Sequence, residues 1–450
     1  MKFQHKKSAF IGRFLFLFFI LNGLTVHHTI FAQTADTLSF KQLFAEAVAK
    51  NYGIKIAQNN LEISKLNNSI GNAGFLPKID MAARDAYSLT SDSKTYFDGT
   101  ESSTDNAGNL LFDAYVQLNW TVFDGLAMFI RKNKLEQYKN LSETQLQAEI
   151  ESVYIDLATL YYNMVQEQKL AQILQYTLDI SKFRLNLAEQ KFRLGSASEL
   201  DKIQASLDFN NDSSEYLTQQ IRLKSTKAQL NQLIGRSPET LFSVGKDVQI
   251  GTVLVFDSLQ KLVTEQNSSV LLAKLNASIK AAELREATSG FLPTLSVFAD
   301  YGYYNSLNYA GTLKSNDNWG PSAGVRLSYT IFDGFNRIRK NQVARIEYQT
   351  SEIRLENSLN EVKAQLYQTY NSYSGALTQI KLESGNLSDA RRNLQIAMET
   401  YQRGALNEVE FREIQRKVIQ LESRFLQAQF AAKLSELRLL HLSGKLALQE

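Results

Sequence analysis

The chain has no cysteine, four prolines and four histidines among its 450 residues. Without cysteine it has no disulfide framework, no thiol nucleophile and no thiolate metal site. His5, His27 and His28 lie in the first 33 residues, so only His441 remains beyond them. A single late histidine argues against a multi-histidine metal site and a histidine-based triad. Because proline costs about 3 kcal/mol in a helix interior, its scarcity favours long uninterrupted helices.

Residues 1–33 have the pattern of a secretory signal peptide. Its basic residues are Lys2, Lys6, Lys7 and Arg13. The apolar segment 14–21 that follows is too short to span a bilayer as a helix. We expect cleavage after Ala32 or Gln33, with an uncleaved stop-transfer anchor as the alternative, and no cysteine is present for a lipid anchor. Without the basic residues the formal net charge falls from +3 to −1, which removes any charge argument for nucleic-acid binding.

The chain is an internal tandem duplication, a pattern that decides the fold more than any single motif. Three short elements recur in the same order: Gly74–Pro77 as Gly290–Pro293, Phe123–Gly125 as Phe332–Gly334, and Phe192–Gly195 as Tyr401–Gly404. The offset is 216 residues for the first pair and 209 for the other two. The difference falls in a polar stretch between Pro77 and Phe123, as expected for a loop tip that tolerates changes in length.

These repeats define the expected domains. The signal peptide is followed by a first repeat at 34–240, a linker at 241–256 and a second repeat at 257–450. Each repeat is predicted to contain a helix, a β-hairpin, a very long helix, a tip turn and a shorter helix. The helices are expected at 40–74, 125–192 and 196–234, and again at 257–289, 334–401 and 405–443. The hairpins are expected at 78–123 and 294–332.

The two long helices carry apolar residues at heptad spacing. The series from Leu146 to Ala188 is mostly apolar, and so is its counterpart from Leu355 to Ala397. A seven-residue repeat of this length indicates coiled-coil packing, with a large globular helical bundle as the alternative. A helix over 125–192 would be roughly 100 Å long, far beyond the hydrocarbon core of about 30 Å.

The strands alternate in a way that points to a membrane. Apolar and polar residues alternate over 116–122, over 325–331 and, less strictly, over 294–303, while the strand at 79–87 has Asp85 on its apolar face. Such segments are typical of an outer-membrane β-barrel, and the alternative is a soluble antiparallel sheet covered by helices. Four strands cannot enclose a lumen and lipid forbids open sheet edges, so several chains would have to share one barrel. The total number of strands in the barrel is then a multiple of four, and the number of chains is left open.

Taken together, the repeated elements resemble those of the TolC-type outer-membrane efflux protein family, over about residues 38–445. The resemblance implies a mixed, mainly α fold: a long antiparallel coiled-coil tunnel plus four transmembrane strands per chain in a shared trimeric twelve-stranded barrel. It also implies a passive conduit in the outer membrane of a Gram-negative bacterium that spans into the periplasm. The implied partners are two further copies of the chain, outer-membrane lipid, a periplasmic adaptor and a proton-driven or ATP-driven inner-membrane transporter. No catalytic residue, cofactor, metal or nucleic acid is implied.

The candidate site residues form three groups. The barrel-to-tunnel junction comprises Gly74, Pro77, Asp124, Gly125, Gly290, Pro293, Asp333 and Gly334, which we interpret as purely structural elements: prolines and glycines that end helices, and aspartates that cap the long ones. The adaptor-docking tip comprises Phe192, Arg193, Leu194, Gly195, Ser196, Tyr401, Gln402, Arg403, Gly404 and Ala405, with an ordinary glycine turn as the alternative. The periplasmic entrance constriction comprises Asp201, Glu410 and Glu413, with solvated helix surface as the alternative.

Two other classes of function compete with the conduit. A structural coiled-coil envelope protein or adhesin would need no amphipathic strand pairs and no matched turns. An enzyme is disfavoured because the chain has one late histidine, no cysteine and no glycine-rich phosphate loop. The substrate, whether drugs, metals or proteins, is not encoded in any of these patterns.

Overall fold

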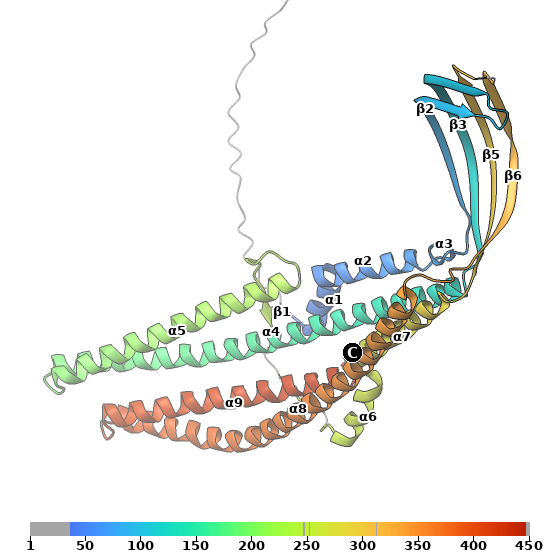
Figure 1. The fold of residues 1–450 in the computed structure, drawn as a ribbon. Coiled ribbons are helices and arrows are strands. Elements are labelled where there is room, and N and C mark those ends of the chain that lie inside the picture. Colours follow the sequence, from blue (N-terminus) through green and yellow to red (C-terminus); the bar gives the residue numbers. More distant parts are fainter. Residues whose placement is uncertain (1–36, 246–247, 252, 312, 447–450) are drawn as a thin grey trace, which may run out of the picture. The chain divides into compact units, whose positions relative to one another are not determined.

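The computed structural model describes residues 37–245, 248–251, 253–311 and 313–446, and the expected signal peptide lies outside these residues. The first half contains β1 (Thr37–Leu38), α1 (Phe40–Lys50), α2 (Tyr52–Asn67), α3 (Ile70–Ala73), β2 (Lys78–Thr95), β3 (Glu101–Phe123), α4 (Ala127–Arg193) and α5 (Glu199–Leu233). The second half contains β4 (Ser243–Val244), α6 (Phe256–Gln266), α7 (Ser268–Ser289), β5 (Thr294–Asn308), β6 (Ser315–Ser328), α8 (Asn336–Gln402) and α9 (Glu408–Leu442). The protein is therefore mainly helical with an antiparallel sheet (Figure 1).

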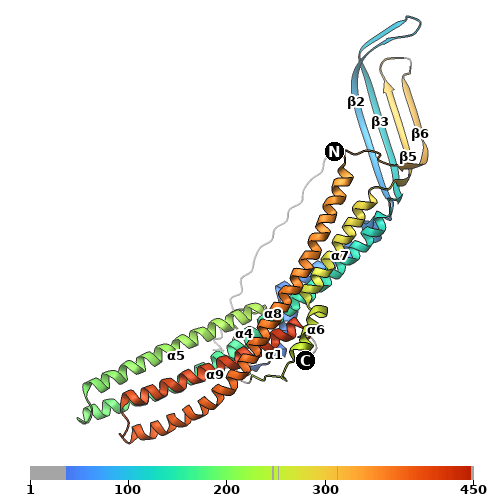
Figure 2. The same ribbon diagram turned by 60° about the horizontal axis from the view of Figure 1, so that its bottom comes forward.

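The long helices show the duplication most directly. Helices α4 and α8 each have 67 residues, and α5 and α9 each have 35. The glycine that follows each long helix adopts a positive φ and lets the chain reverse into the shorter helix. Helix α4 packs along α5, and α8 packs along α9, as Figure 2 shows.

The first helix of each repeat is broken where the sequence analysis predicted one continuous helix. Asn51 ends α1 and starts α2, and its side chain accepts a hydrogen bond from the Ile54 N–H at 3.1 Å. Asn267 does the same between α6 and α7, accepting from the N–H groups of Ser269 and Val270. Asparagine is among the best N-cap residues, so a new helix starts at each of these matched positions.

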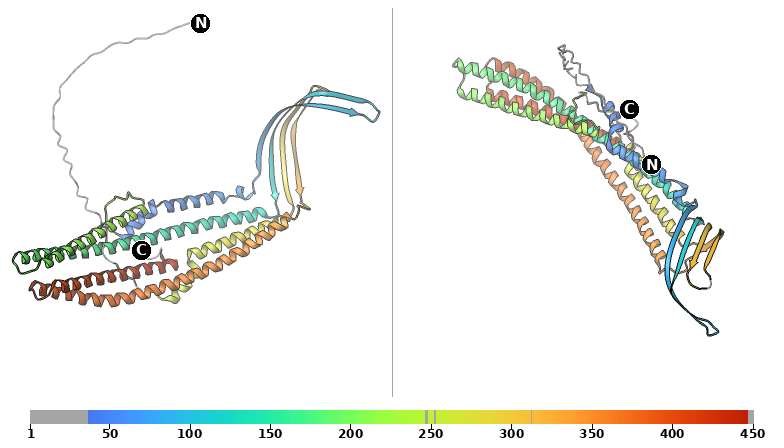
Figure 3. Two further views of the ribbon diagram at one scale, coloured as in Figure 1. Left: turned by 60° about the vertical axis from the view of Figure 1, so that its left-hand side comes forward. Right: turned by 90° about the horizontal axis from the view of Figure 1, so that it is seen from above.

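The four long strands form one antiparallel sheet in the order β2-β3-β5-β6 (Figure 3). Strands β2 and β3 have 18 and 23 residues, against 15 and 14 in β5 and β6, so the first hairpin is the longer one. Strand β6 ends at Ser328, four residues before the end of the predicted hairpin. Within the described chain, β2 and β6 each have one edge without a partner strand.

The strands divide their side chains between two faces. One face carries Ile79, Met81, Val116, Leu118, Leu295, Val297, Val325 and Leu327, which the pairing register places side by side. Several of these remain exposed in the single chain, including Val325 at 67% and Met81 at 80%. The other face carries mostly polar side chains. The sheet is thus amphipathic, with no helix covering its apolar side in the described contacts.

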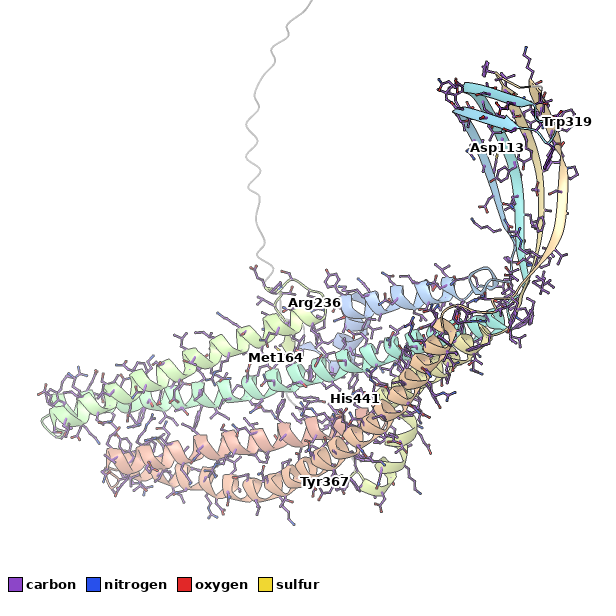
Figure 4. All side chains as sticks on the ribbon, in the orientation of Figure 1. Asp113, Met164, Arg236, Trp319, Tyr367 and His441 are labelled. Atoms are coloured by element: carbon purple, nitrogen blue, oxygen red, sulfur yellow. The ribbon has the colours of Figure 1, made fainter. Side chains whose placement is uncertain are left out.

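The helices pack as two neighbouring arrays that share α4 and α8. Nearer the sheet the order of contacts is α2-α4-α7-α8, and toward the tips it is α5-α4-α9-α8. The largest core cluster joins α1, α2, α4 and α5 through residues such as Leu43, Leu157, Met164 and Leu230, all fully buried; Met164 is marked in Figure 4. Among the described residues, no helix combines the length and the hydrophobicity that crossing a bilayer requires.

Candidate functional site: the strand-to-helix junctions and the helix tips

Each junction between sheet and long helix is built around an aspartate. The Asp124 carboxylate accepts from the Met128 N–H at 3.0 Å and pairs with the Arg131 guanidinium at 2.5 Å. Asp333 accepts from the Arg337 N–H at 3.0 Å in the same way. Both aspartates bond to the first turn of their helix from two residues before its N-cap, where a carboxylate also faces the positive end of the helix dipole.

The junction glycines differ in how strictly the backbone angle and the surrounding space require a glycine. Gly125 has φ +70°, and a Cβ there would lie 2.5 Å from the Ser289 carbonyl oxygen, so no side chain fits. Gly334 has φ +68°, but a Cβ there would meet only the Asn336 side-chain nitrogen, in ordinary contact at 3.8 Å. Gly74 is a left-handed helix cap with φ +94°, whereas Gly290 keeps helical angles. Pro77 and Pro293 directly precede β2 and β5.

The tip turns satisfy the last carbonyls of the long helices. The Gly195 N–H donates to the Phe192 carbonyl at 3.0 Å, and the Ser196 N–H donates to the Lys191 carbonyl at 2.8 Å. Matching bonds run from Gly404 to Tyr401 at 3.0 Å and from Ala405 to Thr400 at 3.1 Å. Both glycines have positive φ, and a Cβ on either would meet no atom within 4 Å, so their neighbourhood is open to a partner.

The side chains of the two tips are unlike. At the first tip Leu194 is 82% exposed and Phe192 is partly exposed, with Lys202 over its ring. At the second tip Tyr401 is buried against Phe411, with ring centroids 5.0 Å apart. Arg193, Gln402 and Arg403 are exposed. Each chain therefore presents two unlike tips: the first exposes Leu194 beside the charged Arg193, and the second exposes polar side chains.

The three constriction candidates lie just past the tips, and two of them cap helices. Asp201 accepts from the Ser198 N–H and hydroxyl at 3.0 and 2.8 Å, and these bonds lower the pKa of its carboxyl. Glu410, its counterpart in the second repeat, accepts from the Asn407 N–H at 3.4 Å. Both are the N3 residue of a capping box. Glu413 is exposed and lines a polar groove of about 540 Å³ between α5 and α9, beside Arg412 and Arg416.

Sequence reasoning missed a buried ionic network just above the tips. Arg184 of α4 is 0% exposed, and its guanidinium donates to Asp208 of α5 at 2.9 Å and also to Glu408 of α9. It donates further to Gln415 at 3.2 Å and lies over the Phe411 ring at 5.5 Å. The two repeats are thus connected through one buried cation.

A second arginine extends this network. Arg412 of α9 pairs with both carboxylate oxygens of Asp212, at 2.6 and 2.8 Å, and Ser181 of α4 also donates to Asp212. The aspartates lie four residues apart on α5, which alone suggests a solvated helix face. Only the three-dimensional packing of α5 against α9 reveals that they are buried, so no sequence signal identified the network.

A longer groove opens on another side of the tip region. It has a volume of about 870 Å³ and lies between α4 and α8 over α9. Its apolar lining includes Tyr176, Ile180, Leu394, Met398 and Phe425, and its rim carries Lys169, Arg391 and Glu399. Within the described residues, no group of three or more acidic or histidine side chains is placed to hold a metal ion.

Comparisons with known proteins agree with this architecture. The chain matches the family model "Outer membrane efflux protein" over residues 43–236 and 259–445. It is 20% identical to the outer membrane protein TolC of Escherichia coli strain K12 over 386 residues, covering 83% of this chain and 75% of that protein. It is 19% identical to the alkaline protease secretion protein AprF of Pseudomonas aeruginosa, covering 73% and 68%.

Solved structures show the same fold. The Campylobacter jejuni CmeC outer membrane channel superposes with a TM-score of 0.75 at 15% identity, covering 90% of this chain and 86% of that chain. The predicted resemblance is therefore confirmed: among these proteins TolC is an outer membrane protein and CmeC is an outer membrane channel. Because the matched segments span both repeats and most of the sequence, the chain belongs to the outer membrane efflux protein family.

Proposed function

We propose that three copies of this chain form an outer-membrane exit duct that passively conducts substrates delivered by an inner-membrane transporter and a periplasmic adaptor. The observation that carries the proposal is the open edge on each side of a single chain. Among the described strands, β2 and β6 lack a partner on one side, and lipid does not tolerate unpaired strand edges. Pairing β6 of one copy with β2 of the next closes the sheet without any edge.

The dimensions of the apolar face suit a bilayer. Phe112 and Trp120 lie on this face of β3, eight residues apart. At 3.3 Å per residue they are about 26 Å apart along the strand, or roughly 20 Å along the membrane normal at the usual strand tilt of about 35–45°, which fits within the apolar band of about 25 Å in outer-membrane barrels. Tyr303 and Trp319, which are cross-strand neighbours near Phe112, add to an upper aromatic girdle.

The helix arrays also have open edges, and these carry exposed apolar stripes. Helix α5 exposes Leu200, Ile203, Leu207, Leu217 and Ile221, and α2 exposes Tyr52, Ile56, Ile63 and Leu66. The opposite edge, α8, exposes Ile346, Ile353, Tyr367, Leu382 and Ile396. Exposed apolar patches of this extent mark interaction sites, and a second copy placed at the sheet edge brings its α8 against these stripes. The helix edges therefore support the same assembly as the sheet edges.

We propose that the tips are the adaptor-docking end. Two features support this: open space at Gly195 and Gly404, and the groove between α4 and α8, whose apolar floor and charged rim suit an amphipathic helix of the adaptor. The expected test replaces Gly195 or Gly404 by Val, with Gly99→Val as the control, because Gly99 in the turn between β2 and β3 also has a positive φ and open space. Loss of efflux with normal trimer formation would support docking, and normal efflux in both tip variants would contradict it.

We propose that Glu413, together with Asp201 and Glu410, lines the entrance. Three-fold symmetry would turn each carboxylate into a ring that favours cations. Because Asp201 and Glu410 also hold helix caps, Glu413→Gln is the cleaner variant. We expect it to lower the cation-over-anion permeability ratio in a planar bilayer, and an unchanged ratio would remove Glu413 from the constriction.

The conduit itself is tested by electrical recording from the detergent-extracted protein. We expect discrete single-channel currents after reconstitution into a planar bilayer. A structural envelope protein or an adhesin would give a stable oligomer without conductance, and that result would refute the proposal. Since AprF is named for protease secretion and TolC is not, the relatives leave the substrate class open.

A further inference from the structure

The polar face of the sheet carries two aromatic rings whose outer edges reach over glycines. A Cβ built on Gly302 would lie 2.7 Å from the Tyr304 ring, and one on Gly324 would lie 2.6 Å from the Phe298 ring. Each ring therefore occupies the space that a side chain at the glycine would fill. Since Phe298 is the cross-strand partner of Gly324, its ring leans from β5 onto β6.

One of these rings already binds a cation. The Arg326 guanidinium of β6 lies 5.1 Å from the centroid of the Phe298 ring. This is the distance at which a cation is attracted to the negative face of an aromatic ring. The Arg326–Phe298–Gly324 group thus demonstrates, within the chain, that a glycine-backed ring on this face accepts a planar cation.

The other ring has the same construction without the cation. Tyr304 is 39% exposed, and its ring is nearly parallel to that of Tyr115, at 17° with centroids 6.4 Å apart. In the described strands, no lysine or arginine lies over either tyrosine. Tyr115 shares its cross-strand row with Gly302, which the Tyr304 ring covers, and with Gly320, whose surroundings are open.

Two carboxylates frame the tyrosine pair. Asp113 of β3 is the cross-strand partner of Tyr304, and Asp300 lies two residues before Gly302 on β5. Asp300 accepts a hydrogen bond from the Ser322 hydroxyl at 2.5 Å. Asp113 has no ion pair among the described residues, although Arg84 is its direct partner on β2. Figure 4 marks Asp113 on this face and Trp319 on the apolar one.

From this arrangement we propose that Tyr115 and Tyr304 form a binding site for organic cations, especially aromatic ammonium compounds, on the inner wall of the barrel. The ligand's cationic head lies over the Tyr304 ring beside Asp113, and its apolar part packs against the Tyr115 ring. The inference rests on the proposed function, because the polar face borders the lumen only if the sheet closes into a conduit.

The experiment is current block in reconstituted wild-type channels by benzyltrimethylammonium. We expect concentration-dependent block, weakened roughly two- to fivefold in Tyr304→Ala, because a cation–π contact at an exposed ring has that order of strength. Tyr304→Phe keeps the ring and should keep the block. The matched control is Tyr303→Ala, which removes the neighbouring tyrosine from the opposite, apolar face and should leave the block unchanged.

The outcomes separate the two proposals. Conducting channels in which Tyr304→Ala and Tyr303→Ala are both blocked like the wild type would overturn the cation site and leave the conduit intact. A wild-type protein without conductance would refute the conduit and the cation site with it. Equal loss of block in Tyr304→Phe and Tyr304→Ala would also overturn the proposal, since the ring face would then not be the binding element.

Discussion

The buried cation at Arg184 leads to a quantitative prediction about the tip region. Replacing Arg184 by Met keeps most of the side-chain volume but leaves Asp208 and Glu408 buried without their shared guanidinium. Removing one partner of a buried ion pair lowers the free energy of unfolding by about 3–5 kcal/mol. Arg412 still lies 3.8 Å from Asp208, and the Tyr401 hydroxyl still donates to Glu408, so we expect the lower end, about 3 kcal/mol.

The assay is amide hydrogen exchange in α5 and α9 around these residues. A loss of about 3 kcal/mol in the local opening free energy raises exchange roughly 100-fold, at 1.4 kcal/mol per factor of ten. The matched control is Lys65→Met with exchange measured in α2, because Lys65 and its partner Glu62 are 47% and 63% exposed. An exposed pair contributes at most about 1 kcal/mol, so exchange should rise less than about fivefold.

A compensated variant sharpens the test. Adding Asp208→Leu and Glu408→Leu to Arg184→Met removes the unpaired charges, and an apolar replacement of a whole buried network is often close to neutral. We expect exchange to return most of the way toward the wild-type rate. Equal rises in local exchange in Arg184→Met and Lys65→Met would refute the reasoning that Arg184 holds the two repeats together.

Three further predictions concern stability. Burial lowers the pKa of His441, so the unfolded chain binds a proton at a higher pH than the folded chain does. The free energy of unfolding should therefore fall as the pH drops below about 6.5. Denaturant titrations of His441→Gln should show a weaker dependence of this free energy on pH. Hydrogen bonds from Arg236 lower the pKa of Glu46, so the ionised carboxylate should contribute its full share to the free energy of unfolding above about pH 4.5. This contribution should disappear as the pH falls below that value, whereas the stability of Glu46→Gln should not depend on pH in this range. Leu157→Ala should lower the free energy of unfolding by about 2–5 kcal/mol in calorimetry, because Leu157 is fully buried. Leu194→Ala should change this free energy little, because Leu194 is exposed. Equal effects of the two substitutions would contradict the assigned core.

Much of the fold could be read from the sequence because its determinants are local and repeated. Heptad spacing predicted the long helices, and the glycines after them predicted the reversals at Gly195 and Gly404. Alternation predicted the strands of the sheet. These signals involve residues close together in the chain, so they remain visible without knowledge of the packing.

The features that escaped prediction depend on single caps or on contacts across the chain. The breaks at Asn51 and Asn267 arise from one side chain each, inside segments whose apolar pattern continues. The Arg184 network joins residues from both repeats, and its charges have ordinary spacing on each helix. Likewise, glycine-backed rings such as Tyr304 on Gly302 appear only once the strands are in register. The alternation of polar and apolar residues in the sequence identifies which strand residues face the polar side of the sheet. It does not reveal how the aromatic rings lie on that side.

The central claim is that three chains share one barrel and one tunnel. The most direct measurement is electron microscopy of the detergent-extracted protein, with averages of particles viewed end-on. The account predicts three-fold symmetry around an open centre, because four strands from each chain then give a twelve-stranded barrel. Averages with two-fold or four-fold symmetry, or particles without a central lumen, would contradict it.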